Sequence, residues 1–412
     1  MKTLVLSCLL LLVFCFFSEA KTIVVCPDCK VKQLTEALDL AADYDTILIK
    51  KGIYSSVNTE IKKQVVIMGE NYPIIDGQEK DEVLVVKADN VTLSGLWVKN
   101  SKRGSMKDYA GIRVVDSRNV KIINCKLENT FFGIYLANSK NCLISGNHSK
   151  GANYGKSDTG NGVQLWKCDS ITIENNHMEG HRDGIYFEFA HFCLIEKNLC
   201  EKNFRYGLHF MFSDSDIYRQ NTFQNNGTGV AVMYTKNVEM YDNIFRNNWG
   251  DAAYGLLLKD ISNSIIERNT FTNNTVGVTM EGSNRITFSK NNFASNGYAL
   301  KVMANCIGDT FMYNNFTANT FDAATNGELR ENSFKYNYWD KYEGYDLNRD
   351  KIGDIPFRPV SLYSMIIEQM PYAVMLLRSF TVEILNRAEK SIPGIVPETF
   401  QDYEPMMKPN VL

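Results

Sequence analysis

Short alternating strands recur about every 22 residues between Gly111 and Phe334. Because successive side chains of a strand point to opposite faces, Ile185 and Phe187 of one repeat share a face, and Tyr186 lies on the other. Each repeat opens with a small residue: Gly111, Gly133, Gly162, Gly184, Gly207, Gly229, Gly255, Gly277 and Ala299. A fixed period built from strands, with no helix between them, predicts a solenoid.

An asparagine marks a second position in each repeat, where the chain is expected to turn. Its side chain can hydrogen-bond nearby backbone and tolerates a left-handed φ, and stacked asparagines can bond along the column. The series is Asn147, Asn176, Asn198, Asn221, Asn243, Asn269, Asn291, Asn314 and Asn332. Leucine-rich repeats have a similar period, but their helical arm and Leu-x-x-Leu-x-Leu pattern are missing from this sequence. We therefore predict an all-β fold, a single-stranded right-handed parallel β-helix with an N-terminal helical cap and a C-terminal helical tail.

Four segments follow from the pattern. Residues 1–20 are predicted as a signal peptide, residues 21–100 as the cap and first coils, residues 101–340 as the regular repeats, and residues 341–412 as a C-terminal loop with an amphipathic helical docking tail. In the cap, apolar residues recur at helical spacing, and a helix there would cover strand edges that otherwise pair with other chains.

The tail is predicted to be helical over residues 361–390. It is rich in apolar residues, but charged residues and a proline interrupt it, so it is not expected to span a bilayer. Two alternatives stay open for its apolar side. It either docks onto a partner or a membrane surface, or packs back along the side of the solenoid.

The first segment has the three parts of a secretory signal. Lys2 supplies the positive charge, the apolar core of residues 4–17 is too short to span a bilayer, and Ala20 ends a small-residue cleavage site. Lipoprotein processing is the alternative, but Cys8 comes too early and Cys15 follows a bulky residue. We expect an exported protein that is cleaved after Ala20.

The composition is that of a globular chain without a strong charge bias. The protein has 412 residues, of which 44% are hydrophobic, and a formal net charge of −3. These values exclude a basic nucleic-acid binder and a disordered acidic tail. No nucleic-acid partner is therefore expected, and the repeats form one domain.

Unusual residues gather at the outward positions of the middle repeats. Counted from the opening residue, offsets two and four point outward, and they place His209, Met211 and Met233 on neighbouring rungs. Imidazole together with thioether sulfur suits Cu(I), so these three residues are candidate copper ligands. The alternative is an apolar docking face for a partner protein, for which methionine is also well suited. His177 and His181 each fit a polar turn position.

The mature chain opens with Cys26-Pro27-Asp28-Cys29. Cys26 and Cys29 form either a thiolate metal site, a redox couple or a local disulfide of an oxidising compartment, and alone they offer only two metal ligands. Other cysteines fall on the repeat pattern, where buried free thiols behave as small hydrophobes. These are Cys142, Cys193 and Cys200 at inward positions, and Cys125 at the position of a turn asparagine.

Asp346, Asn348, Asp350 and Asp354 place oxygens at alternate positions, as in the first half of a calcium loop. A lysine stands where that loop needs glycine, and a phenylalanine stands where it needs a bidentate acid, which excludes a full EF-hand. A smaller Ca²⁺ site and a hydrogen-bonded Asx loop are the two alternatives.

Several of these segments together resemble the NosD family, periplasmic maturation proteins of nitrous-oxide reductase. The resemblance covers nearly the whole mature chain and is most specific over residues 180–378. The segments that carry it are residues 181–188 (HRDGIYFE), 205–213 (RYGLHFMFS), 229–234 (GVAVMY), 253–259 (AYGLLLK), 276–282 (VGVTMEG) and 358–368 (RPVSLYSMIIE).

The resemblance implies a periplasmic, non-enzymatic role in assembling the copper or copper–sulfur centres of nitrous-oxide reductase. The implied partners are an ABC-type ATPase (NosF), a permease (NosY) that holds the protein at the membrane, the copper chaperone lipoprotein NosL and the reductase apoprotein. No ligand assignment comes with the resemblance, so the copper candidates rest on spacing.

The main rival function is that of a β-helix polysaccharide lyase, hydrolase or epimerase. Such enzymes need paired carboxylates, or a carboxylate with a basic residue, on one outer face. Asp183 and Glu188 with Arg182 are the nearest candidates, but Met211 stands where the next coil would supply another acid. A metal-free scaffold for partner docking is the other alternative.

Overall fold

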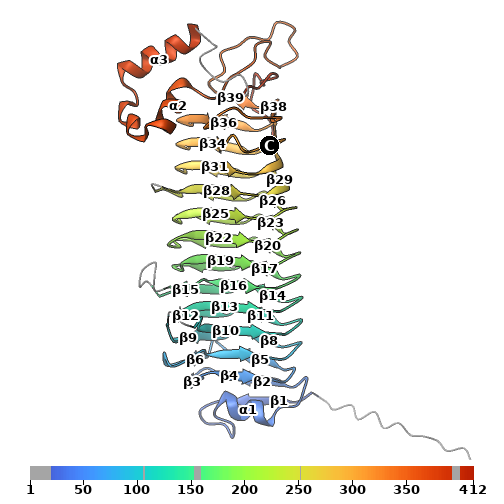
Figure 1. The fold of residues 1–412 in the computed structure, drawn as a ribbon. Helices are drawn as coiled ribbons and strands as arrows, with labels where there is room; N and C mark the ends of the chain where they lie inside the picture. The colour runs from blue at the N-terminus through green and yellow to red at the C-terminus, as the bar shows by residue number, and fades with distance from the viewer. Residues whose placement is uncertain (1–19, 105–106, 153–158, 251, 392–399) are drawn as a thin grey trace, which may run out of the picture.

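The computed structural model describes residues 20–104, 107–152, 159–250, 252–391 and 400–412. The predicted signal peptide lies outside these residues, apart from Ala20. The described chain winds into coils that stack from strand β1 (Thr22–Val25) and helix α1 (Leu34–Leu40) at one end to strand β39 (Tyr338–Trp339) at the other (Figure 1). Equivalent strands of successive coils pair in parallel and form three long sheets. The prediction of a parallel β-helix is confirmed.

The first sheet has 14 strands and begins with β1. Its further strands are β2 (Thr46–Ile49), β5 (Val66–Gly69), β8 (Thr92–Ser94), β11 (Lys121–Ile123), β14 (Leu143–Ser145), β17 (Thr172–Glu174), β20 (Leu194–Glu196), β23 (Ile217–Arg219), β26 (Glu239–Tyr241), β29 (Ser262–Glu267), β32 (Asn284–Ser289), β35 (Thr310–Met312) and β38 (Ser333–Lys335).

The second sheet has 12 strands, and the opening residues of the regular repeats lie in or next to them. These strands are β4 (Thr59–Ile61), β7 (Leu84–Val86), β10 (Ala110–Val115), β13 (Phe132–Ala137), β16 (Val163–Trp166), β19 (Asp183–Glu188), β22 (Tyr206–Met211), β25 (Thr228–Met233), β28 (Tyr254–Lys259), β31 (Val276–Glu281), β34 (Tyr298–Val302) and β37 (Phe321–Ala324).

The third sheet has 13 strands and ends with β39. The others are β3 (Ile53–Ser55), β6 (Ile74–Asp76), β9 (Trp97–Lys99), β12 (Lys126–Thr130), β15 (His148–Gly151), β18 (His177–Glu179), β21 (Leu199–Glu201), β24 (Thr222–Gln224), β27 (Ile244–Arg246), β30 (Thr270–Thr272), β33 (Asn292–Ala294) and β36 (Asn315–Thr317).

The core is a set of inward columns in which like residues stack from coil to coil. In one column Phe245 lies 4.7 Å from Phe271, which lies 4.8 Å from Phe293, all between ring centroids. Cys200 pairs in register with Phe223 at the start of this column and is buried, as predicted. Cys125, Cys142 and Cys193 are also buried free thiols, as the repeat pattern indicated.

The glycines that open the repeats, all but the last of which begin with one, are required by the neighbouring coil. A Cβ atom on Gly184 would lie 2.6 Å from the carbonyl oxygen of Gly207, and one on Gly207 would lie 2.8 Å from that of Gly229. Both distances are shorter than a side chain and a backbone oxygen tolerate, so a larger residue would push the coils apart.

The turn asparagines form a continuous ladder, as predicted. Asn198, for example, accepts the backbone N–H of Asn176 at 3.0 Å and donates its own amide to the carbonyl of Ile173 at 2.8 Å. Cys125 occupies the asparagine position of its coil and donates its N–H to Asn147. The ladder therefore supplies hydrogen-bond partners to the buried backbone N–H and C=O groups at this corner of the coils.

Two details of the predicted ladder were wrong. Its last asparagine is Asn337, which accepts the N–H of Asn314, whereas Asn332 lies at another corner and accepts the N–H of Asp309. The left-handed φ also falls one residue before the ladder position, as at Lys197 with φ 54°. The ladder side chain must point inward to bond the next coil, so the preceding residue makes the turn.

A second ladder, which was not predicted, runs along another corner. Asn226 accepts the N–H of Asn203 at 3.0 Å and donates to the carbonyl of Cys200 at 3.0 Å. The series comprises Asn203, Asn226, Asn248, Asn274, Asn296 and Asn319. Each member follows a residue of the first ladder by five positions, so the signal was present in the sequence.

Both ends of the solenoid are covered. Helix α1 buries Leu34, Ala37 and Leu38 against the first coil, as its spacing predicted. At the other end, residues 400–412 return to the last coil, where Phe400 stacks on Phe334 with centroids 4.3 Å apart. Asp402 accepts hydrogen bonds from the indole of Trp339 and from the side chain of Asn337, each at 3.0 Å, and so terminates the first asparagine ladder.

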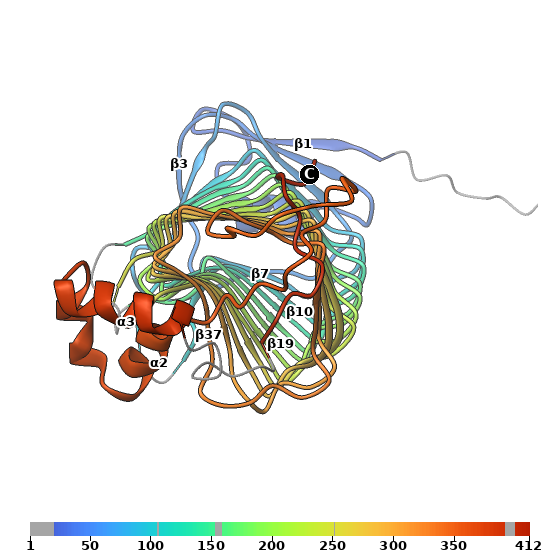
Figure 2. The same ribbon diagram turned by 90° about the horizontal axis from the view of Figure 1, so that it is seen from above.

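The tail forms helices α2 (Leu362–Gln369) and α3 (Phe380–Ser391), joined by the 3-10 helix η1 (Pro371–Leu376). They lie to one side of the solenoid when it is viewed along its axis (Figure 2). Tyr363 and Ile367 of α2 pack with Phe321 of β37. Other apolar side chains stay exposed, among them Tyr372 at 88% and Met375 at 84%. Among the described residues, no helix is both long enough and apolar enough to cross a membrane.

Candidate functional site

The outward face of β19, β22 and β25 holds the candidate copper ligands. His209 and Met211 are two residues apart on β22 and therefore point to the same side. Met211 pairs in register with Met233 of β25 and with Glu188 of β19. The structure thus places the three residues together on neighbouring rungs, at the positions that the repeat spacing predicts.

His209 lies deeper than the two methionines, which are half-buried. Its side chain is 7% exposed, and its ring packs against Tyr186, with centroids 5.0 Å apart, and against Tyr206 at 4.7 Å. On one edge of the ring, Nδ1 lies 3.3 Å from Nη2 of Arg205 and 3.7 Å from Oδ2 of Asp183. On the other edge, Nε2 is buried and has no hydrogen-bond partner in the described part of the chain.

The carboxylate behind His209 is held in its charged form. Asp183 is fully buried and receives the guanidinium of Arg205 through both of its oxygens, with Nε 2.8 Å from Oδ1. Burial by itself would raise the pKa of Asp183, but the hydrogen bonds from Arg205 and His209 outweigh it and lower the pKa below its ordinary value. Sequence reasoning named Asp183 only as a candidate acid of an enzyme and missed this pairing.

Charged side chains lie on the rungs on either side of Met211 and Met233. Burial, together with the nearby carboxylate of Glu188, raises the pKa of Tyr186 to about 12, so its hydroxyl stays protonated and donates to Glu188 at 3.3 Å. Beyond Met233, Lys259 and Glu281 form an ion pair at 3.3 Å. The two thioethers therefore lie between charged rungs.

An aromatic strip, which was not predicted, borders the thioethers. Phe189, Phe212 and Tyr234 follow Glu188, Met211 and Met233 directly in the sequence. Their rings stack at 5.3 and 5.2 Å, and they are exposed by 40, 40 and 43%. The face therefore combines candidate ligands with an apolar surface suited to a partner.

The donor set fits Cu(I). The unpartnered Nε2 of His209 and the thioether sulfurs of Met211 and Met233 are soft or borderline ligands. Arg205, 3.3 Å from the other ring nitrogen, and Asp183, 3.7 Å from it, hold the imidazole in place from behind, as outer partners do at metal sites.

Known proteins resemble this chain over most of its length. A family model described as "Periplasmic copper-binding protein (NosD)" matches residues 39–157 and 149–344. The chain belongs to the NosD family. It is 26% identical over 357 residues to "Probable ABC transporter binding protein NosD" of Stutzerimonas stutzeri, which spans 81% of this chain and 80% of that protein. A relative of the same description from Pseudomonas aeruginosa is 29% identical over 72 residues, or 18% of this chain and 17% of that protein.

Solved structures share the fold of this NosD-family chain. The Streptococcus pneumoniae surface protein and adhesin PfbA superimposes with a TM-score of 0.60 at 14% identity, over 71% of this chain and 94% of that chain. The Dettilon tailspike protein gives 0.54 at 13% identity, over 70% and 64%. At such identities the likeness shows the β-helix alone. Family and relatives together indicate a NosD-type periplasmic accessory role linked to an ABC transporter.

At the two other predicted metal sites, the cysteine pair and the acidic loop, the candidate ligands are engaged in bonds within the protein. Cys26 and Cys29 are joined in a disulfide, the local alternative that the sequence left open, and in this form they offer no thiolate to a metal. In the acidic loop, Asp346 accepts the N–H groups of Arg349 and Lys351, and Asp354 accepts that of Leu347.

These contacts, with those of Asn348 and Asp350, make a hydrogen-bonded Asx loop. Neither this geometry nor the description of the family supports the calcium alternative.

Proposed function

We propose that this NosD-family protein is a non-enzymatic accessory factor that carries Cu(I) as cargo during assembly of the copper centres of nitrous-oxide reductase. The observation that carries the proposal is the buried Nε2 of His209, which has no hydrogen-bond partner in the described chain and lies on the same face as two thioether rungs. An unpaired polar atom in a buried position costs free energy, which a ligand would recover.

The face has the properties needed to receive an ion and release it again. His209, held between Asp183 and two tyrosine rings, supplies a positioned nitrogen, and the half-buried Met211 and Met233 supply sulfurs nearer to solvent. Three neutral ligands hold Cu(I) without thiolate, so a competing set of ligands on a partner can displace them. We propose a NosL-like chaperone as donor and the reductase apoprotein as acceptor.

The helical tail is the proposed docking element for the membrane partners. Its exposed apolar side chains on η1 and at the start of α3 are not among the residues of the small core that holds the tail to the solenoid. A NosY-like permease with its NosF-like ATPase would cover Tyr372, Met375 and Phe380 and keep the protein peripheral at the membrane.

The structure gives less support to a carbohydrate-active enzyme. Asp183 is fully buried and paired with Arg205, so it is not available as a base or nucleophile toward a substrate. A metal-free docking scaffold is a stronger alternative than an enzyme, because the exposed aromatic strip beside Met211 is suited to contact with a partner protein.

The test is a Cu(I) titration of the full-length mature protein in competition with a chromogenic chelator. His209→Ala, Met211→Leu and Met233→Leu should each weaken binding at least about tenfold, because each removes one donor atom. Met303→Leu is the matched control, since Met303 stands at the same offset three coils beyond Met233. A Cys26→Ser/Cys29→Ser variant should bind as the wild type does. If the wild-type protein does not bind Cu(I), the copper-carrier proposal fails and the metal-free docking scaffold is favoured.

A further inference from the structure

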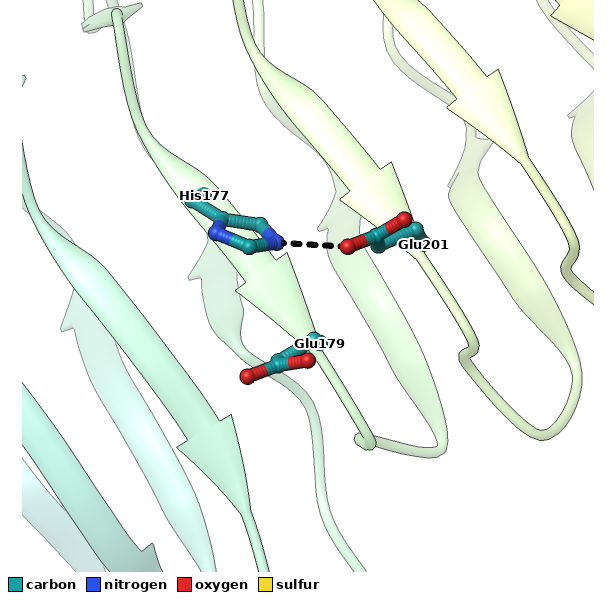
Figure 3. Close-up of side chains that lie close together, drawn as sticks. All are labelled: His177, Glu179 and Glu201. Carbon is teal, nitrogen blue, oxygen red and sulfur yellow. Dashed lines mark hydrogen bonds and ion pairs between the residues drawn. The ribbon is translucent and has the colours of Figure 1, made fainter.

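A second cluster of metal-ligand residues lies on the outer face of the third sheet, across β18 and β21. Nε2 of His177 lies 3.1 Å from Oε1 of Glu201, and one ligand atom each of His177, Glu179 and Glu201 lie within 4.8 Å of one another. Figure 3 shows the imidazole facing the carboxylate of Glu201, with Glu179 beside them on the same strand as His177. Among the described residues, this is the one such group of three His, Cys, Asp or Glu side chains.

The neighbouring coil adds a second imidazole. His148 of β15 pairs in register with His177, and the two rings stack with centroids 4.6 Å apart and planes 3° from parallel. Nε2 of His148 lies 3.3 Å from Oε1 of Glu179. Two imidazoles and two carboxylates therefore meet on three successive rungs.

Glu201 is held in position from its far side. Its Oε2 accepts a hydrogen bond from Gln224 at 2.7 Å, and Gln224 in turn accepts one from Arg246 at 2.6 Å. This leaves Oε1 directed toward His177. Outer partners of this kind orient the ligands of metal sites. The two carboxylates are also well shielded, with side chains of Glu179 and Glu201 exposed by 18 and 13%.

We propose that His177, Glu179 and Glu201 bind a divalent first-row transition cation, with the ring of His148 stacked beside them. Two atoms that each lie about 2.1 Å from one cation are about 3.0 Å apart at a right angle and about 3.4 Å apart at the tetrahedral angle. The distance from Nε2 of His177 to Oε1 of Glu201, 3.1 Å, falls in this interval. A rotation of the Glu179 side chain would bring its carboxylate, whose ligand atom is now within 4.8 Å of those of His177 and Glu201, to the same spacing.

The ligand types select a cation different from the proposed cargo. Imidazole with carboxylate suits Zn²⁺ and similar divalent ions, whereas the thioether face suits Cu(I). Lys150 and Lys202, each 3.8 Å from one of the carboxylates, are the cations now closest to them. Both side chains are largely exposed, and such surface ion pairs are weak, so a divalent cation would displace them. The bound ion would tie together β18 and β21.

The probe is Zn²⁺, titrated into the full-length mature protein in competition with a chromogenic chelator. We expect one equivalent to bind, and His177→Ala and Glu201→Gln each to weaken binding at least about tenfold. His191→Ala and Glu239→Gln are matched controls, because His191 contacts Asp214 at a corner and Glu239 contacts Tyr241 on the first sheet. Both should bind Zn²⁺ as the wild type does.

Co²⁺ provides a second readout, because its visible absorption reports the ligands directly. We expect the wild-type protein to give the spectrum of bound Co²⁺. Loss of this spectrum in Glu201→Gln, with circular dichroism showing that the variant is folded, supports the site. Failure of the wild type to bind Zn²⁺ at micromolar concentration, or equal weakening in the control variants, would overturn it. His209→Ala should bind Zn²⁺ normally, which separates this outcome from failure of the Cu(I) proposal.

Discussion

His209 and Asp183 lie on adjacent strands with Nδ1 of the imidazole 3.7 Å from Oδ2 of the carboxylate, and Arg205 contacts both. The carboxylate is fully buried, while the opposite edge of the imidazole carries the unpartnered Nε2. Asp183 therefore acts on His209 from behind and would not itself touch a bound ion.

The first prediction concerns this positioning role. Asp183→Asn should lower Cu(I) affinity about tenfold, as loss of an outer partner usually does, while the three ligand residues remain. It should also lower the free energy of unfolding at neutral pH by about 2 to 4 kcal/mol, since Arg205 loses its buried partner but keeps some solvent. Chelator competition and urea unfolding measure the two effects.

The matched control is Asp242→Asn. Asp242 also pairs with an arginine of the next coil, Arg268, but both side chains are about 40% exposed, so the expected loss of stability is under about 1 kcal/mol. Because the folded-state pKa of Asp183 is lowered, its contribution is present above its unfolded pKa and lost as pH falls through the folded value. The gap between wild type and Asp183→Asn should therefore close in acid. A gap that does not narrow at all as the pH falls below the unfolded-state pKa of the aspartate would contradict this account.

The second prediction concerns a buried acid with the opposite shift. Burial raises the pKa of Asp309 from 3.8 to about 7, because its Oδ2 has no hydrogen-bond partner among the described residues. A raised folded-state pKa means that stability is fully present below the unfolded pKa and is lost as pH rises through 7. Asp309→Asn keeps the oxygen that accepts the N–H of Ile286 and removes the titration.

Asp309→Asn should therefore match the wild type near pH 4 and be more stable at pH 8, as measured by thermal unfolding across this range. Asp39→Asn, on the exposed side of α1, is the control and should follow the wild type throughout. Equal stability of Asp309→Asn and wild type at pH 8 would show that the acid is not buried in its charged form.

The third prediction tests the asparagine ladder. Asn221 accepts the N–H of Asn198 at 3.0 Å and donates to the carbonyl of Ile195 at 2.9 Å, and all of these groups are buried. Asn221→Ala leaves them without partners, which should lower the free energy of unfolding by about 2 to 4 kcal/mol. Asn292→Ala, on the outward side of β33, should change it by less than about 0.5 kcal/mol. A similar loss of unfolding free energy in both variants would show that the ladder hydrogen bonds do not stabilise the fold.

The fourth prediction concerns the tail. Tyr372→Ser combined with Met375→Ser should weaken association with vesicles that contain the permease, while Cu(I) affinity and unfolding stay unchanged, because both side chains are over 80% exposed. Leu347→Ser is the control, since Leu347 is 78% exposed and belongs to the acidic loop, not to the tail helices. If the double variant associates with the vesicles as strongly as the wild type does, the proposal that the tail docks onto the permease is contradicted.

Much of the fold follows from short-range pattern. The opening glycines and the first asparagine series predict the coils, because each coil repeats the same contacts with its neighbour and register follows from the period. The same arithmetic placed His209, Met211 and Met233 on one outward face. The second ladder, including Asn226, was equally visible and was overlooked. The 23-residue step from Asn314 to Asn337 was likewise open to view.

Other features of the fold and the site depend on contacts between residues that the 22-residue repeat does not relate. Asp402 closes the first ladder from far along the chain, and Arg205 reaches back one coil to Asp183. His177, expected as a polar turn residue, instead meets Glu201 because the coil between them returns it to the adjacent rung. The sequence by itself determined which residues face outward on each rung, since alternation and period are local. Only the tertiary structure decided which charges and ligands meet, because side-chain reach, burial and the return of the C-terminus act between segments that the period does not relate.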